Sequence, residues 1–152
     1  MKKLGVLLVC AIVAIISCEE GFNEPKESIA TSSESHNWGM NCMQCHAKGG
    51  PGSGWFTAAG SVQNSNDGKP LAGNAKIELW KVPGTGKPVK VIEVDQLGNF
   101  YTTSKIDWGR DGLYPAVVGP SGNRIFMPYK TKIGACNSCH NNKDFAPMIW
   151  AY

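Results

Sequence analysis

Short apolar stretches separated by turn residues fill the middle of the chain. Each stretch is rich in β-branched and aromatic residues and partly alternates, which is typical of half-buried β-strands. We expect strands at residues 56–63, 75–82, 89–94, 99–104, 114–119 and 124–130. Segments such as PGTGKP and PSGN provide turns between them. This spacing predicts a mainly β fold, a small antiparallel β-sandwich, with a small barrel as the alternative.

The second of these stretches has two distinct faces. Ile77 and Leu79 share one face, while Lys76 and Glu78 share the other. We therefore expect one side of this strand to face the core and the other to face water. Trp80 falls on the polar face, which indicates a cover that the strands do not supply.

The string GSVQNSNDGKPLAGNAKIELW, followed by VIEVDQLGNFYT, resembles the carboxypeptidase-regulatory or transthyretin-like β-sandwich family. The resemblance covers residues 60–104 and depends on Gly60, Val62, Pro70, Leu71, Gly73, Gly98 and Phe100. These are mainly turn and core positions, so the resemblance implies the fold of a spacer or binding platform and no catalytic residue. The strands also contain no GxSxG or HExxH motif. We do not expect an enzyme.

The chain opens with the basic residues MKK and continues with an apolar run up to residue 17. The run is shorter than the roughly 20 apolar residues of a membrane-spanning helix and predicts a signal peptide over residues 1–17. Its end resembles the lipobox of bacterial lipoproteins, which implies lipid attachment at Cys18. An ordinary signal peptide with an incidental cysteine is the alternative.

The residues after the apolar run predict where the protein works. Residues 18–35 are polar and lack periodicity, which favours a flexible tether. We expect an exported protein held by lipid on a bacterial membrane, with the outer membrane favoured, on its periplasmic face or at the cell surface. The net charge is +3, and Lys2 and Lys3 lie in the signal peptide. Without a basic run, we expect no nucleic-acid partner.

A CxxCH motif lies on each side of the β module. Residues 36–55 contain the first motif and residues 131–152 the second, with the β-sandwich at 56–130 between them. The motif residues are Cys42, Cys45 and His46, and Cys136, Cys139 and His140. Three chemistries fit this spacing: a four-cysteine zinc site, redox or structural disulfides, and covalent haem attachment.

Compartment and motif content favour haem. In an oxidising space, free thiolates that await zinc tend to form disulfides. A thioredoxin-like role would need a βαβ setting, which the chain lacks. Both of those interpretations leave His46 and His140 without a role. Haem attachment uses every motif residue, because the two thiols bond the haem and the histidine binds its iron as proximal ligand.

Through residues 42–46 and 136–140 the chain resembles a dihaem c-type cytochrome, although it lacks the helices that wrap a single-haem cytochrome c. We expect the haems to rest against the β module, or against each other if the chain ends meet. The chain has three histidines, so four histidine ligands are not available within it. Candidate distal ligands are Met127, Met148, His36 and Met40.

The sequence thus predicts a membrane-anchored c-type cytochrome with two haems that transfers electrons between redox partner proteins of the cell envelope. The alternative is a non-enzymatic lipoprotein whose sandwich binds a partner while its CxxC pairs hold structural zinc or disulfides. A catalytic or ligand-sensing haem is a third hypothesis, which requires an iron without a sixth ligand.

Overall fold

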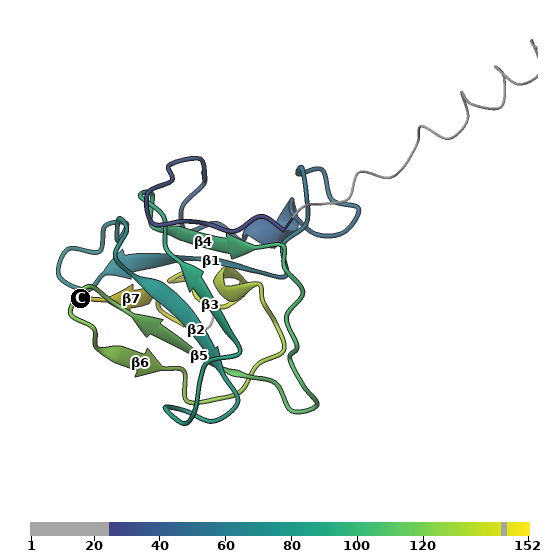
Figure 1. The fold of residues 1–152 in the computed structure, drawn as a ribbon. Coiled ribbons are helices and arrows are strands. Elements are labelled where there is room, and N and C mark those ends of the chain that lie inside the picture. The colour runs from purple at the N-terminus through teal and green to yellow at the C-terminus, as the bar shows by residue number, and fades with distance from the viewer. Residues whose placement is uncertain (1–24, 144–145) are drawn as a thin grey trace, which may run out of the picture.

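The computed structural model describes residues 25–143 and 146–152 (Figure 1). The predicted signal peptide and the predicted lipidation of Cys18 lie outside these residues. Within the described ranges no helix has both the length and the apolar character needed to cross a membrane.

The described residues form seven strands in two sheets that pack as layers (Figure 1). The three-stranded sheet has the order β4-β1-β7, and the four-stranded sheet has the order β3-β2-β5-β6. All pairs are antiparallel except β1 with β7, which is parallel. The predicted small β-sandwich is confirmed. The strands are β1 (Ala58–Asn64), β2 (Lys76–Trp80), β3 (Lys90–Glu93), β4 (Asn99–Thr102), β5 (Tyr114–Val118), β6 (Arg124–Phe126) and β7 (Ile149–Ala151).

Each of the six predicted strands is present, with ends trimmed by a few residues. The seventh, β7, lies in the segment that the sequence assigned to haem binding. Its parallel pairing with β1 joins Val62 to Ile149, far apart in the chain. The second CxxCH segment is therefore part of the sandwich and completes one of its sheets.

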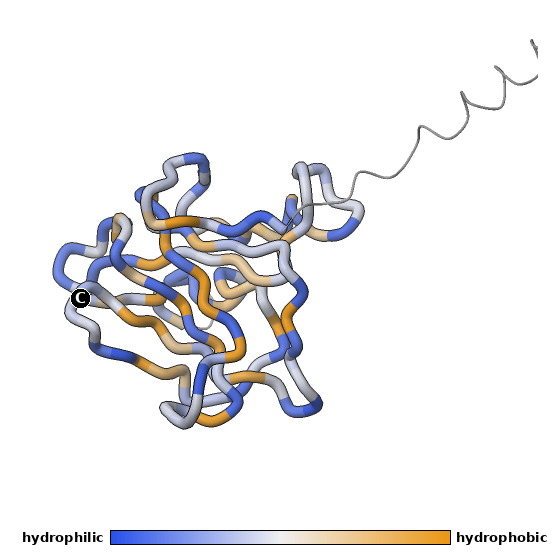
Figure 2. Tube along the Cα trace, in the orientation of Figure 1, coloured by the Kyte–Doolittle hydropathy of each residue, from blue (hydrophilic) through white to orange (hydrophobic). Residues whose placement is uncertain are grey.

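The core lies between the two sheets. Val62 and Phe100 from the three-stranded sheet are fully buried with Ile77 and Ile92 from the other. Figure 2 shows hydrophobic residues along the strands and hydrophilic residues in the loops between them. Full burial of a side chain of this size stabilises the fold by about 1.5–3 kcal/mol. Ile77 and Leu79 face this core as predicted.

The outer face of β2 differs from the prediction. Glu78 was expected to face water but is 3% exposed, because Arg124 of β6 donates to it from Nε at 2.6 Å and from a second nitrogen at 3.2 Å. Trp80 Nε1 donates to the same carboxylate at 3.0 Å. The guanidinium lies 5.1 Å from the Trp80 ring centre, and the Phe126 ring packs edge-on against it. The cover over Trp80 thus comes from β6 of the same sheet.

Residues 26–30 lie along β3 and β4. Ser28 is 3% exposed, and its backbone N donates to the Tyr101 carbonyl at 3.0 Å while its hydroxyl donates to the Glu93 carbonyl. Glu27 accepts from Lys90 and from Thr102 Oγ1. This part of the expected flexible tether is docked on the sandwich, since buried backbone groups at the edge of β4 find partners there.

Candidate functional site

Each CxxCH motif folds into one short 3₁₀ turn. The turns are η1 (Cys42–Gln44) and η2 (Cys136–Ser138). The backbone N of the motif histidine donates to the carbonyl of the first cysteine, at 2.9 Å for His46 and 3.0 Å for His140. This hydrogen bond brings both cysteines and the histidine onto a single turn in each motif.

In each motif, Nδ1 of the histidine ring contacts a backbone carbonyl oxygen. His140 Nδ1 lies 2.8 Å from the Pro147 carbonyl oxygen, and His46 Nδ1 lies 3.2 Å from the carbonyl oxygens of both Ser53 and Gly54. A carbonyl oxygen can only accept, so the neutral ring carries its proton on Nδ1. Nε2 then keeps the lone pair that binds a metal. In both motifs a carbonyl seven residues beyond the histidine provides this contact.

Gly52 allows the loop after the first motif to approach the His46 ring. A Cβ at this position would lie 2.8 Å from His46 Nδ1 and 3.0 Å from the Cys45 carbonyl oxygen. The glycine-rich segment 48–54 therefore helps to position the His46 ring.

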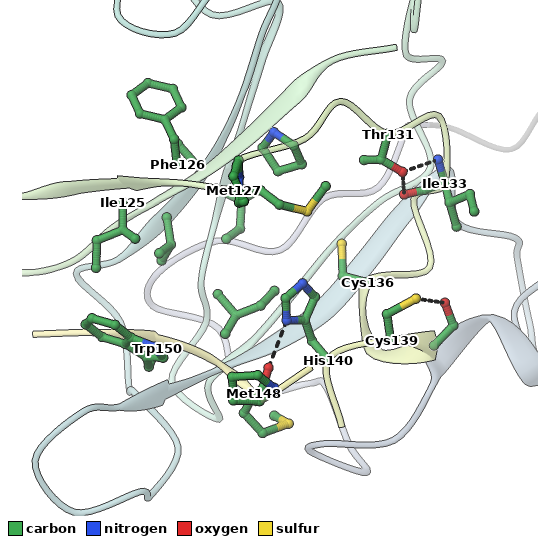
Figure 3. A pocket seen from close by; sticks show the side chains of 18 of the residues that line it. Ile125, Phe126, Met127, Thr131, Ile133, Cys136, Cys139, His140, Met148 and Trp150 are labelled. Carbon is green, nitrogen blue, oxygen red and sulfur yellow. Dashed lines mark hydrogen bonds between the residues drawn. The ribbon is translucent and has the colours of Figure 1, made fainter. Parts of the chain in front are cut away.

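A cleft of about 270 Å³ opens beside the second motif, between β5–β6 and the segment that runs from η2 into β7. Most of the side chains that line it are apolar. Figure 3 shows His140 in this cleft with Met127 and Met148 on opposite sides of its ring, and both Cys136 and Cys139 nearby. The two thiols and the imidazole of one motif thus face the same apolar space.

A second cleft, of about 320 Å³, opens beside the first motif. Cys42, Cys45 and His46 line it, together with His36 and Met40. The His36 and His46 ring centres are 5.8 Å apart and the ring planes make an angle of 43°.

Two aromatic rings form a stack with the His46 ring. Phe56 stacks on the His46 ring at 4.4 Å between ring centres, and Tyr101 stacks on Phe56 at 4.7 Å. This stack fixes the plane of the imidazole against the β4 side of the sandwich.

A buried polar cluster joins the two motifs across β1. Asn137, 1% exposed and inside the second CxxC loop, donates from Nδ2 to the Met40 carbonyl at 3.1 Å and to Ser61 Oγ at 3.0 Å. Its Oδ1 accepts from Ser61 N at 3.0 Å. Ser61 Oγ also accepts from Gly39 N at 2.9 Å. The segments that carry the two motifs therefore meet on the β module.

No family model, no curated protein and no solved structure matches this chain.

Burial raises the pKa of Cys136 to about 12, with a smaller contribution from the nearby Cys42. Burial also raises the pKa of Cys42 above its ordinary value. Reactive redox thiols need the opposite shift, so the environment of this pair does not favour redox chemistry.

The four motif cysteines are free thiols. Among the described residues, no three His, Cys, Asp or Glu side chains converge on one point that could hold a metal ion. In a CxxCH haem site the thiols and the histidine bind different atoms of one large ligand, so convergence is not needed.

The structure places every described candidate residue beside a motif. His36 and Met40 lie at the first cleft, and Met127 and Met148 lie at the second. Ser61, Asn137 and the acceptor carbonyls of Ser53 and Pro147 were not predicted. A sequence gives no signal for a carbonyl acceptor, and a small polar residue in a CxxC loop has many other uses.

Proposed function

We propose that the protein is a c-type cytochrome of the bacterial cell envelope that carries two covalent haems and passes electrons between redox partner proteins, while a lipid on Cys18 anchors it to the membrane. The observation that carries this proposal is the repeated arrangement of the motif histidines. His46 and His140 each have Nδ1 on a backbone carbonyl and Nε2 free, beside a cleft that both thiols of the same motif also line.

The residues present fit two haems. Cys42 and Cys45 would hold the first haem, and Cys136 and Cys139 the second, each through two thioether bonds. A haem would supply a one-electron couple at its iron. The hydrogen bond at Nδ1 fixes the ring tautomer and raises the basicity of the histidine as a ligand. The apolar walls of the clefts exclude water from part of each haem surface and so influence its potential.

The relation between the motifs suits electron relay. The second motif lies against β1, where a Cβ on Gly60 would be 2.9 Å from Cys136 Cβ, and Asn137 bonds to the carbonyl of Met40 next to the first motif. Both motifs thus lie against the same part of the sandwich.

The test is expression in a host that matures c-type haem. We expect a mass increase of two haems, haem that stays bound after denaturation, and a sharp α-band on reduction. Replacement of Cys42 and Cys45 by Ser should remove one haem, and the same change at Cys136 and Cys139 should remove the other. Ser138→Ala, which retains both thiols of its motif, is the matched control and should keep both haems. A colourless protein with stoichiometric zinc, or with two disulfides, would contradict the proposal and support the lipoprotein binding module instead.

A further inference from the structure

Two histidines line the first cleft. The ring centres of His36 and His46 are 5.8 Å apart and the ring planes make an angle of 43°. Two imidazoles that bind one metal ion from opposite sides, each with a metal–nitrogen bond of about 2 Å, would have their ring centres roughly 6 Å apart. The observed separation is close to that value.

His36 is also free to bind. Within the described part of the chain neither of its ring nitrogens has a hydrogen-bond partner, whereas its backbone carbonyl accepts from Asn99 Nδ2 at 3.4 Å. Asn99 also donates to Ser35 Oγ at 2.9 Å, so β4 holds this segment at the cleft. Met40 lines the same cleft, and both residues are exposed. We choose His36 because its ring centre lies 5.8 Å from that of His46.

At the second cleft the free nitrogen of His140 points toward Met127 (Figure 3). The backbone N of Met127 donates to the Pro115 carbonyl at 2.8 Å, which ties the residue to β5. Pro128 follows it and restricts the backbone further. The thioether is thus presented to the cleft from a fixed position on the far side of the His140 ring.

Met148 lies on the opposite side of that ring. Its backbone follows the Pro147 carbonyl that binds His140 Nδ1, and its backbone N donates to Asn142 Oδ1 at 2.9 Å. The side chain is 3% exposed, and a Cβ on Gly39 would lie 3.9 Å from its terminal methyl group. Met148 therefore packs between the motifs on the proximal side.

We infer that His36 is the distal ligand of the first haem and Met127 that of the second. This inference rests on the proposed function and extends it, since it makes the two sites chemically different. Methionine as the second axial ligand raises the potential of a haem relative to histidine. The haem at His140 is then the more oxidising, and an electron that enters at the first motif moves to the second.

Paired leucine substitutions in the holoprotein test the second site. Met127→Leu keeps the volume and removes the sulfur, while Met148→Leu is the matched control. We expect Met127→Leu to abolish the red charge-transfer band of methionine-ligated ferric haem, to lower the potential of one haem, and to allow one carbon monoxide per chain to bind after reduction. Met148→Leu should retain the band. Retention of the band in Met127→Leu, or its loss in Met148→Leu, would overturn the assignment.

His36→Ala and Met40→Leu test the first site in the same way. His36→Ala should remove the electron paramagnetic resonance signal of bis-histidine haem and open one iron to carbon monoxide, while Met40→Leu should leave both properties unchanged. An unchanged signal in His36→Ala would overturn this half of the inference. Mass spectrometry separates the two levels: a wild type without haem contradicts the proposed function, whereas variants with both haems and unaltered spectra contradict only the ligand assignment.

Discussion

Replacement of Asn137 by Ala should weaken the whole sandwich and not only the second motif. The Asn137 side chain fills a gap in the pairing along β1. Before the gap, Ala59 N donates to the Gly134 carbonyl, and after it β7 pairs with β1 from Val62 onward. Between these two pairings, Ser61 N donates to Asn137 Oδ1. Ser61 is fully buried. Without Asn137, water does not reach its N–H.

The expected magnitude follows from the three bonds that are lost. An orphaned buried N–H costs about 1–3 kcal/mol, and each of the two Nδ2 bonds contributes about 0.5–1.5 kcal/mol. Part of this cost is recovered because water can reach the Met40 carbonyl at the cleft, so we expect a loss of roughly 2–4 kcal/mol. Stabilities of small domains are about 5–15 kcal/mol, so this is a large fraction of the total.

The assay is urea unfolding of the holoprotein, followed by far-ultraviolet circular dichroism. Asn137→Asp keeps the acceptor for Ser61 N but would bury a carboxylate beside the Met40 carbonyl, so it should lose at least as much as Asn137→Ala. Asn66→Ala, in an exposed turn, is the control and should change the free energy of unfolding by less than about 0.5 kcal/mol. If Asn137→Ala were as stable as that control, the cluster would not join the motifs energetically.

Three further predictions concern single residues and pH. Gly52→Ala should reorient the His46 ring and shift the potential of the first haem alone, as measured by redox titration, because its Cβ would lie 2.8 Å from Nδ1; a shift at the second haem would contradict this. Gly60→Ala should cost about 1–3 kcal/mol of unfolding free energy, since its Cβ would meet Phe100 at 2.6 Å, and an unchanged urea midpoint would refute the close contact. Burial raises the pKa values of Glu78 and Glu27, but hydrogen bonds outweigh this effect and hold both pKa values below the ordinary 4.5. The hydrogen bond that contributes most comes from Arg124 for Glu78 and from Lys90 for Glu27. Stability from these carboxylates is therefore complete above pH about 4.5 and lost as the pH falls through their lowered values; a Glu27→Gln, Glu78→Gln double variant should flatten this dependence in urea titrations from pH 7 to 3.

The local pattern of the chain predicted the strands well and their surroundings poorly. Alternation and turn residues located β1 to β6 because these signals are contained in a few neighbouring residues. β7 has three residues and forms because β1 offers it a parallel partner, which no local signal reveals. Glu78 and Trp80 look solvent-facing by alternation, and contacts with the Arg124 guanidinium of β6 help to make their burial favourable.

The candidate site shows the same division. CxxCH is a local signal, so the two motifs and their histidines were evident from the sequence. Their closeness depends on Ser61 and Asn137, which are joined by long-range hydrogen bonds. His36 reaches the first cleft because Asn99 of β4 holds its segment. Tertiary contacts of this kind cannot be predicted from spacing.

The parallel pairing of β7 with β1 also bears on the order of events as the chain folds. Hairpins such as β2–β3 and β5–β6 close short loops, whereas β7 can dock only after β1 has been placed, at a larger cost in loop-closure entropy. We therefore expect the segment that carries Cys136 and Cys139 to be fixed late. Until then its thiols are accessible to an attachment enzyme, and the final docking of β7 would bury the Cys136 side of the finished site.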